Sequence, residues 1–179
     1  MSASGRIPAR RQKHQPEEGQ LLIDYFYFGR SHKILLLLHG RSHYQVSIPV
    51  GDDEEDLVRS FGQIVKELGL TGKPVTVRSD NESGLLALVE RISKNPSFPG
   101  SSIHFDPAPV GRPQSKGMLE RAVQTARCSF YCVWLELEQW VYPDGNQRLP
   151  LGGVLFTMAL LYSSRCINMY RTRKLDQST

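Results

Sequence analysis

Cysteine and long apolar runs are the two features in which this chain is poor. Its three cysteines, Cys128, Cys132 and Cys166, are odd in number and form no Cys-x-x-Cys pair, which favours reduced, buried thiols over a disulfide framework. The longest apolar runs, 34–38 and 154–161 (broken by Thr157), fall far short of the roughly 18 residues needed to cross a bilayer. We therefore expect both runs in the core, and no membrane partner.

A secretory signal and an internal repeat are also missing. Residues 1–20 are basic and polar without an apolar centre, so we expect an intracellular protein, in the nucleus or the cytoplasm. At 179 residues the chain fits one domain, and its apolar fraction of 40% and charged fraction of 22% exclude wholesale disorder and fibrous repeats. We divide it into a flexible basic leader (1–19), a core (20–172) and a tail (173–179).

The formal net charge of +4 is unevenly distributed. Basic residues gather at the two ends of the chain: Arg6, Arg10, Arg11, Lys13 and His14, then Arg165, Arg171, Arg173 and Lys174. Such clusters can neutralise phosphates and so bind nucleic acid without sequence specificity. Solubilising tails would have the same composition, and charge alone leaves both interpretations open.

Apolar periodicity predicts an α/β protein. Segments 21–28, 33–39 and 44–50 look like strands of an antiparallel meander, and strands 74–79 and 102–105 flank a helix at 84–94, which implies a parallel crossover. The acidic run 52–56 invites a metal-site interpretation, but it opens a helix that ends at Gly69 or Gly72, where carboxylates favour the N-terminus. Two further helices are expected at 115–140 and 151–170.

Three acidic residues break their local patterns. Asp24 interrupts an apolar and aromatic strand, where an unpaired buried charge would be costly, although a solvent-facing edge would also accommodate it. Asp80 follows a strand at the end where α/β sheets bind ligands, but Asp-Asn is also a good turn and helix cap. Glu120 lies on a helix, where a solvated position near Lys116 is the alternative.

The helix that carries Glu120 is amphipathic. Its predicted buried stripe consists of Leu119, Val123, Ala126, Phe130, Val133 and Leu137. An adjacent polar stripe is formed by Lys116, Glu120, Gln124 and Arg127.

The ordered set of patterns resembles the retroviral and retrotransposon integrase superfamily. It comprises Asp24 before aromatic residues, then Ser79-Asp80-Asn81, then Pro-Gln-Ser-Lys-Gly-Met-Leu-Glu-Arg-Ala at 113–122, with 55 and 39 residues between the successive acids. The last pattern is the most specific. Two positions depart from the family: Glu82 stands where Gly is common, and Lys116 where Asn is common. The paired His and Cys of the family's zinc module are missing, so we expect an isolated core or a fragment of a polyprotein.

The resemblance implies a ribonuclease H-like fold with a five-stranded mixed sheet flanked by helices. It implies that Asp24, Asp80 and Glu120 are catalytic and bind two Mg²⁺ or Mn²⁺ ions, that Lys116, Gln124 and Arg127 contact DNA, and that cores form homodimers or higher multimers. The implied function is cleavage and joining of DNA 3′ ends during integration of a retroelement. The alternatives are a ribonuclease H-like nuclease and a degenerate, non-catalytic remnant that binds nucleic acid.

Overall fold

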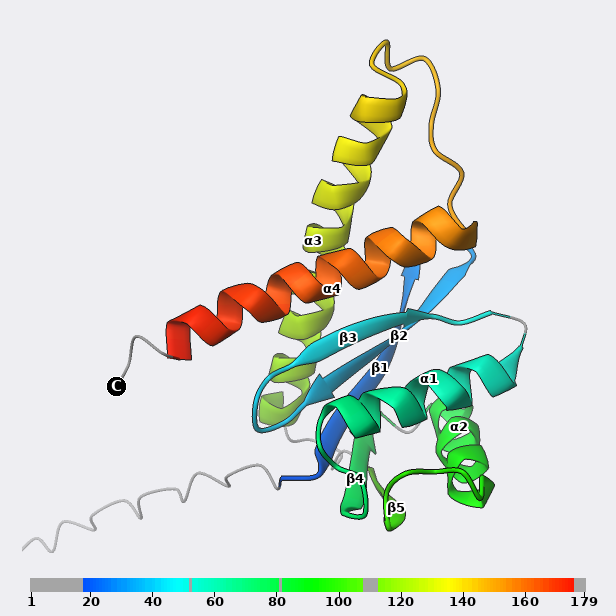
Figure 1. Ribbon diagram of the computed structural model, residues 1–179, viewed down its shortest axis with the longest axis vertical. Coiled ribbons are helices and arrows are strands. Elements are labelled where there is room, and N and C mark those ends of the chain that lie inside the picture. Colours follow the sequence, from blue (N-terminus) through cyan, green and yellow to red (C-terminus); the bar gives the residue numbers. More distant parts are fainter. Residues whose placement is uncertain (1–17, 52, 81, 108–112, 176–179) are drawn as a thin grey trace, which may run out of the picture.

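A computed structural model describes residues 18–51, 53–80, 82–107 and 113–175, except for the side chains of 113–116 and 171–175. Five strands and four helices form in this part of the chain (Figure 1). The strands are β1 (Gln20–Phe28), β2 (His32–His39), β3 (Gln45–Pro49), β4 (Pro74–Ser79) and β5 (Ser102–Pro107). The helices are α1 (Glu54–Glu67), α2 (Ser83–Lys94), α3 (Pro113–Val141) and α4 (Gly153–Leu175).

The five strands form one mixed sheet in the order β3-β2-β1-β4-β5. The first three pair antiparallel, whereas β1 with β4 and β4 with β5 pair parallel. This confirms the α/β class and the ribonuclease H-like arrangement expected from the sequence. The expected elements all form; the largest boundary error concerns α4, which begins at Gly153 and ends at Leu175.

The acidic run before α1 caps the helix. Asp53 is the N-cap, and its side-chain oxygen accepts a 2.8 Å hydrogen bond from the Glu55 backbone N–H. Gly69 follows the last turn with φ of +68°, a conformation that glycine adopts without a steric penalty. The capping interpretation of residues 53–56 is therefore confirmed; residue 52 lies outside the described part.

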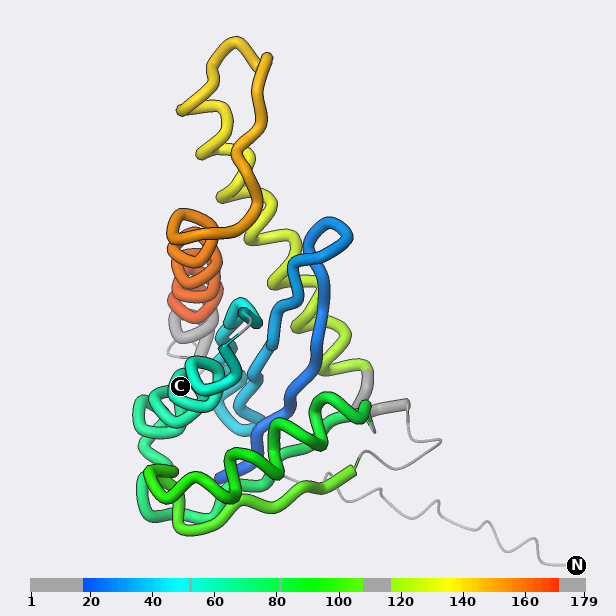
Figure 2. The backbone as a smooth tube through the Cα atoms, turned by 90° about the vertical axis from the view of Figure 1, so that its right-hand side faces the viewer, coloured from blue at the N-terminus to red at the C-terminus, as the bar shows by residue number. Residues whose placement is uncertain are grey.

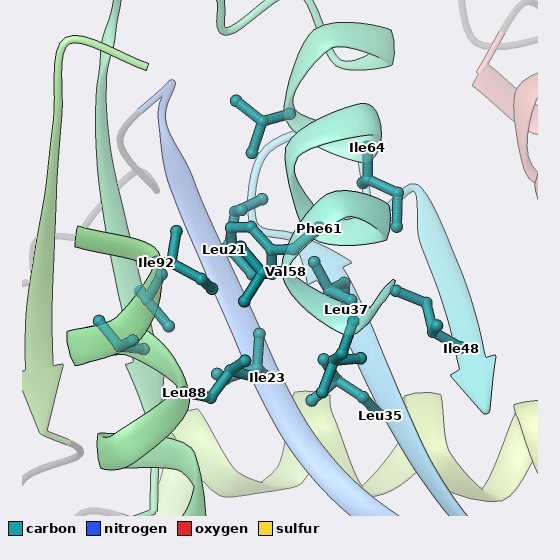
Figure 3. Close-up of a cluster of buried hydrophobic side chains, with 14 of the residues drawn as sticks. Leu21, Ile23, Leu35, Leu37, Ile48, Val58, Phe61, Ile64, Leu88 and Ile92 are labelled. Carbon is teal, nitrogen blue, oxygen red and sulfur yellow. The ribbon is translucent and has the colours of Figure 1, made fainter. Parts of the chain in front are cut away.

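The sheet separates two apolar clusters. One joins alternate residues of β1 and β2 to α1 and α2 around the fully buried Phe61 (Figure 3). The other joins the opposite faces of these strands to α3 and α4, and it is rich in aromatic rings: Phe26, Phe28, Phe130, Trp134 and Phe156. Figure 2 shows that the last turns of α3 and the segment after them project well beyond the end of the sheet.

The buried stripe of α3 differs from the predicted one. Leu119, Ala126 and Phe130 are buried as expected, but Val123, Val133 and Leu137 are only half-buried. Ala122, Trp134 and Glu138 are buried instead, and Glu138 accepts hydrogen bonds from Leu149 N and Arg148. The burial of Glu138 reflects its contacts with the returning chain at the far end of α3.

The prediction of buried thiols was wrong for two cysteines. Cys128 and Cys132 are exposed, and Cys166 is half-buried. The buried residues Ala126, Phe130 and Trp134 are spaced by four, so positions two residues away from each point to the opposite side of α3. All three cysteines are free, as expected.

Helix α4 covers the edge strand β3. Asn168 accepts a hydrogen bond from Gln45 N (2.9 Å) and donates one to Gln45 O (2.8 Å), and Ser164 Oγ accepts one from Ser47 N (3.1 Å). These contacts occupy backbone groups that an edge strand would otherwise offer to another strand. In the described part of the chain, none of the helices combines the length and apolarity needed to cross a membrane.

Candidate active site

Asp24 lies in the middle of β1 on the α3 side of the sheet. Leu22, Phe26 and Phe28 belong to the cluster with α3 and α4, whereas Leu21 and Ile23 belong to the cluster with α1 and α2. Since side chains alternate along a strand, Asp24 shares the face of Leu22 and Phe26. Its side chain is half-buried. The solvent-facing edge alternative is therefore wrong, because β1 is the central strand.

The electrostatic surroundings of Asp24 disfavour its charged form. Burial is the main cause and raises the pKa of Asp24 from 3.8 to about 6. A hydrogen bond from the Tyr25 backbone and the positive charge of Arg127 lower this pKa, whereas the negative charges of Asp80 and Glu82 raise it further. A carboxylate held in these conditions would be stabilised by a nearby cation.

Asp80 lies at the same end of the sheet as Asp24. The last pair between β1 and β4 is Leu22 with Arg78. Asp24 follows Leu22 by two residues, and Asp80 follows Arg78 by two residues. Because the strands are parallel, the continued register places Asp80 alongside Asp24, in agreement with its effect on the Asp24 pKa. The Asp80 side chain is exposed, and its carbonyl accepts a 2.7 Å hydrogen bond from Ser79 Oγ.

Glu120 lies on α3 toward this same end. The Phe130 ring packs against the Phe28 ring at a tilt of 37°, with centroids 4.2 Å apart, and the Arg127 guanidinium lies 5.5 Å from the Phe26 ring centroid. Helix α3 therefore runs along β1 in the same direction. Asp24 precedes Phe26 by about 7 Å of strand, and Glu120 precedes Arg127 by about 10 Å of helix. Two helical turns separate Glu120 from Arg127, which places both on one stripe.

The structure does not assemble the three acids into one metal-binding group. Glu120 is exposed. Among residues 18–51, 53–80, 82–107 and 117–170, no three His, Cys, Asp or Glu side chains lie close enough together to hold a metal ion. Asp24 and Asp80 nevertheless supply two oxygen ligands of the kind that Mg²⁺ and Mn²⁺ prefer, and their mutual repulsion would be relieved by a divalent ion.

Of the three predicted DNA contacts, two are described. Gln124 and Arg127 are exposed on α3, and Arg127 lies near enough to Asp24 to lower its pKa. Lys116 lies in the first turns of α3, but its side chain is outside the described part of the chain. The described part of the α3 stripe thus carries exposed polar and basic groups, and its Arg127 lies close to Asp24.

Sequence reasoning missed two ion pairs beside the aspartates. Glu82 pairs with Lys33 of β2 (3.8 Å), and Arg78 of β4 pairs with Asp106 of β5, with a 3.0 Å hydrogen bond from Nε. Only Glu82 gave a sequence signal, as a departure from the resembled family. Lys33 and Asp106 are distant in sequence from Asp80, and Arg78 occupies a strand position without any unusual pattern. No local pattern therefore indicates these partners.

Comparisons with known proteins bear on the fold. No protein-family model matches the chain, and no curated protein does. A similar fold occurs in a chain of a solved structure, the cryo-electron microscopy structure of the simian T-cell lymphotropic virus intasome in complex with PP2A regulatory subunit B56 gamma. The TM-score is 0.53 at 13% sequence identity, and the match covers 87% of this chain and 50% of that chain. This chain therefore spans about half the length of its structural neighbour.

Proposed function

We propose that this chain is the catalytic core of a metal-dependent DNA strand transferase of the integrase type. The observation that carries the proposal is the half-buried Asp24 in the central strand, close enough to Asp80, just after the carboxyl end of the parallel strand β4, for the two charges to interact. A desolvated carboxylate destabilises a fold, so its position in the core favours a role in binding a cation. The similar fold of a chain in the simian T-cell lymphotropic virus intasome structure supports the proposal.

In this proposal Asp24, Asp80 and Glu120 hold two Mg²⁺ or Mn²⁺ ions, which would activate the attacking oxygen and stabilise the leaving one. Glu120 would approach the aspartates from α3. Lys116, Gln124 and Arg127 would hold the phosphates of the DNA strand beside the carboxylates. Attack by water on a phosphodiester would trim a DNA end, and attack by a DNA 3′-hydroxyl would join it to target DNA.

A second copy of the chain is part of the proposal. Helix α4 packs Phe156, Ala159 and Leu160 inward. On its outer side it exposes large apolar side chains: Val154, Leu155, Met158, Leu161, Tyr162, Met169 and Tyr170. An exposed apolar surface of this kind is typical of an interface, and a homodimer or higher multimer would cover it. Sedimentation of the wild type beside Met158→Asp tests this, since a dimer that uses α4 should dissociate in the variant.

The experiment that tests catalysis compares Glu120→Gln with Glu136→Gln. Both glutamates are exposed on α3, sixteen residues or about 24 Å apart, so the second variant controls for the loss of one charge from the helix. A labelled DNA end is incubated with protein, Mn²⁺ and target DNA, and trimmed and joined products are scored beside a DNA-binding titration. We expect Glu120→Gln to bind DNA as the wild type does but to lose both products, and Glu136→Gln to retain both.

The same assay separates the alternatives. Trimming without joining in the wild type would favour a ribonuclease H-like nuclease. The non-catalytic remnant is favoured by the absence of an assembled three-ligand group in the described residues. Such a remnant would bind DNA, but it would form neither product and would not bind Mn²⁺. Full activity in Glu120→Gln would remove this glutamate from the mechanism.

A further inference from the structure

Glu82 occupies the N-cap of α2, two residues after Asp80, but its side chain does not cap the helix. Its backbone carbonyl accepts the first helical hydrogen bonds, from Leu85 N (3.0 Å) and Leu86 N (3.1 Å). The N-cap of α1 behaves differently, because the Asp53 carboxylate bonds to the backbone N–H of Glu55. The Glu82 carboxylate is thus directed to a partner outside its own helix.

That partner is Lys33 of β2. Its ammonium lies 3.8 Å from Glu82 Oε1 and 3.6 Å from the centroid of the Tyr25 ring. A Cβ added to Gly84 would lie 3.5 Å from Tyr25 Cε2, 3.7 Å from Lys33 Nζ and 3.9 Å from Glu82 Oε1. The three side chains therefore converge over the first turn of α2, and the small residue there leaves room for them.

This cluster, Tyr25, Lys33 and Glu82, connects the two segments that carry the candidate ligands. Tyr25 is the chain neighbour of Asp24 on β1, and Glu82 is separated from Asp80 by a single residue. We propose that Glu82 is a positioning residue, which Lys33 and Tyr25 hold so that the start of α2 keeps Asp80 beside Asp24. The inference rests on the proposed function, because it assigns the cluster a role in metal binding.

A positioning role differs in its consequences from a through-space charge effect. If Glu82 and Lys33 acted only as charges, loss of the glutamate would weaken binding of a divalent cation and loss of the lysine would strengthen it. If they hold the start of α2 in place, loss of either should weaken binding. The sign of the Lys33 effect therefore distinguishes the two explanations, even though a partly exposed ion pair contributes little to stability.

The test measures Mn²⁺ dissociation constants by titration calorimetry for the wild type, Glu82→Gln, Lys33→Gln and Lys33→Arg. We expect roughly 10-fold weaker binding in the first two variants, as is typical for partners that orient metal ligands. Lys33→Arg should bind like the wild type, since arginine keeps the charge and stacks on an aromatic ring. The control is Lys94→Gln, which breaks the exposed pair of Lys94 with Glu90 (2.7 Å) on the same helix and should change nothing.

Hydrogen exchange of the Leu85 and Leu86 amides gives a second readout that needs no metal. Both Gln variants should exchange several times faster there than the wild type, and Lys94→Gln should not. Tighter Mn²⁺ binding in Lys33→Gln, or wild-type binding in both Gln variants, would overturn the positioning role. If the wild type binds no Mn²⁺, the proposed function fails. Faster exchange in the Gln variants would then still show that the cluster anchors the start of α2, and unchanged exchange would show that it anchors nothing.

Discussion

The two faces of β1 are built differently. Toward α1 and α2, Leu21 and Ile23 are fully buried in an apolar layer (Figure 3). Toward α3, the buried Leu22 and Phe26 are separated by Asp24, a carboxylate whose charged form is disfavoured there. On the α1 and α2 side, β1 thus contributes a continuous apolar layer. On the α3 side, Asp24 interrupts the apolar layer.

The α3 face therefore contains the destabilising group of this strand. On the α3 side, aromatic packing of Phe28 with Phe130 and Phe156 begins just beyond Asp24 and compensates for the interruption. Local rules of packing are commonly broken at functional sites and satisfied around them. Four experiments test this contrast between the faces.

Removal of the Phe130 ring should have the largest effect. Phe130 is buried among Phe28, Trp134 and Phe156, so Phe130→Ala should lower the free energy of unfolding by about 3–5 kcal/mol. The neighbouring Tyr131 is 50% exposed, and Tyr131→Ala should cost less than about 1.5 kcal/mol. Urea unfolding measures both. If Phe130→Ala loses no more free energy of unfolding than Tyr131→Ala, this aromatic layer does not support the α3 face.

Asp24→Asn should change how stability depends on pH. The folded pKa of Asp24 is about 6 against an ordinary 3.8, so the folded state retains the proton longer than the unfolded state as pH rises. Asp24 therefore makes stability fall between about pH 4 and pH 6, by at most about 3 kcal/mol before solvent screening reduces it. In Asp24→Asn this fall should disappear, and the variant should be more stable than the wild type at pH 7 by about 1–2 kcal/mol.

Urea unfolding from pH 4.5 to 7.5 measures this difference. Asp144→Asn, in the exposed segment between α3 and α4, is the matched control and should follow the wild type at every pH. Parallel curves for the wild type and Asp24→Asn would show that Asp24 titrates as an ordinary surface carboxylate. The two faces would then not differ in their electrostatics.

Asn168→Ala tests how α4 completes its side of the sheet. The variant loses two hydrogen bonds to the Gln45 backbone and leaves edge groups of β3 without these partners, which should cost about 1–2 kcal/mol. Arg165 is exposed on the same helix and outside its apolar surface, and Arg165→Ala should stay within about 0.5 kcal/mol of the wild type. Thermal unfolding compares the two. No loss in Asn168→Ala would mean that water replaces the amide at this edge.

Divalent ions should produce the smallest shift. Mn²⁺ at about five times its dissociation constant stabilises a folded state by about 1 kcal/mol when it binds only that state. We expect Mn²⁺ to raise the melting temperature of the wild type, and to raise it less in Asp24→Asn. An equal rise in both proteins would place the ion elsewhere, and no rise in either would leave the interrupted face without a cation.

Much of the fold could be predicted from local patterns. Alternating apolar residues located the strands, and the acidic residues before Leu57 located the start of α1, because caps and periodicity depend on neighbours in sequence. The anomaly of Asp24 was also visible, since a carboxylate among apolar strand residues is unusual in any fold. The resemblance added Asp80 and Glu120 as ligands, and these roles stay predictions.

Local sequence patterns therefore specify the set of elements, their order and the positions at which a charge departs from the pattern. Which groups meet depends on how the elements pack. The exposure of Cys128 depends on which side of α3 faces the sheet, and the contact of Lys33 with Glu82 joins residues of β2 and the start of α2. Such contacts follow from the twist, register and crossing of packed elements, which no single stretch of sequence encodes.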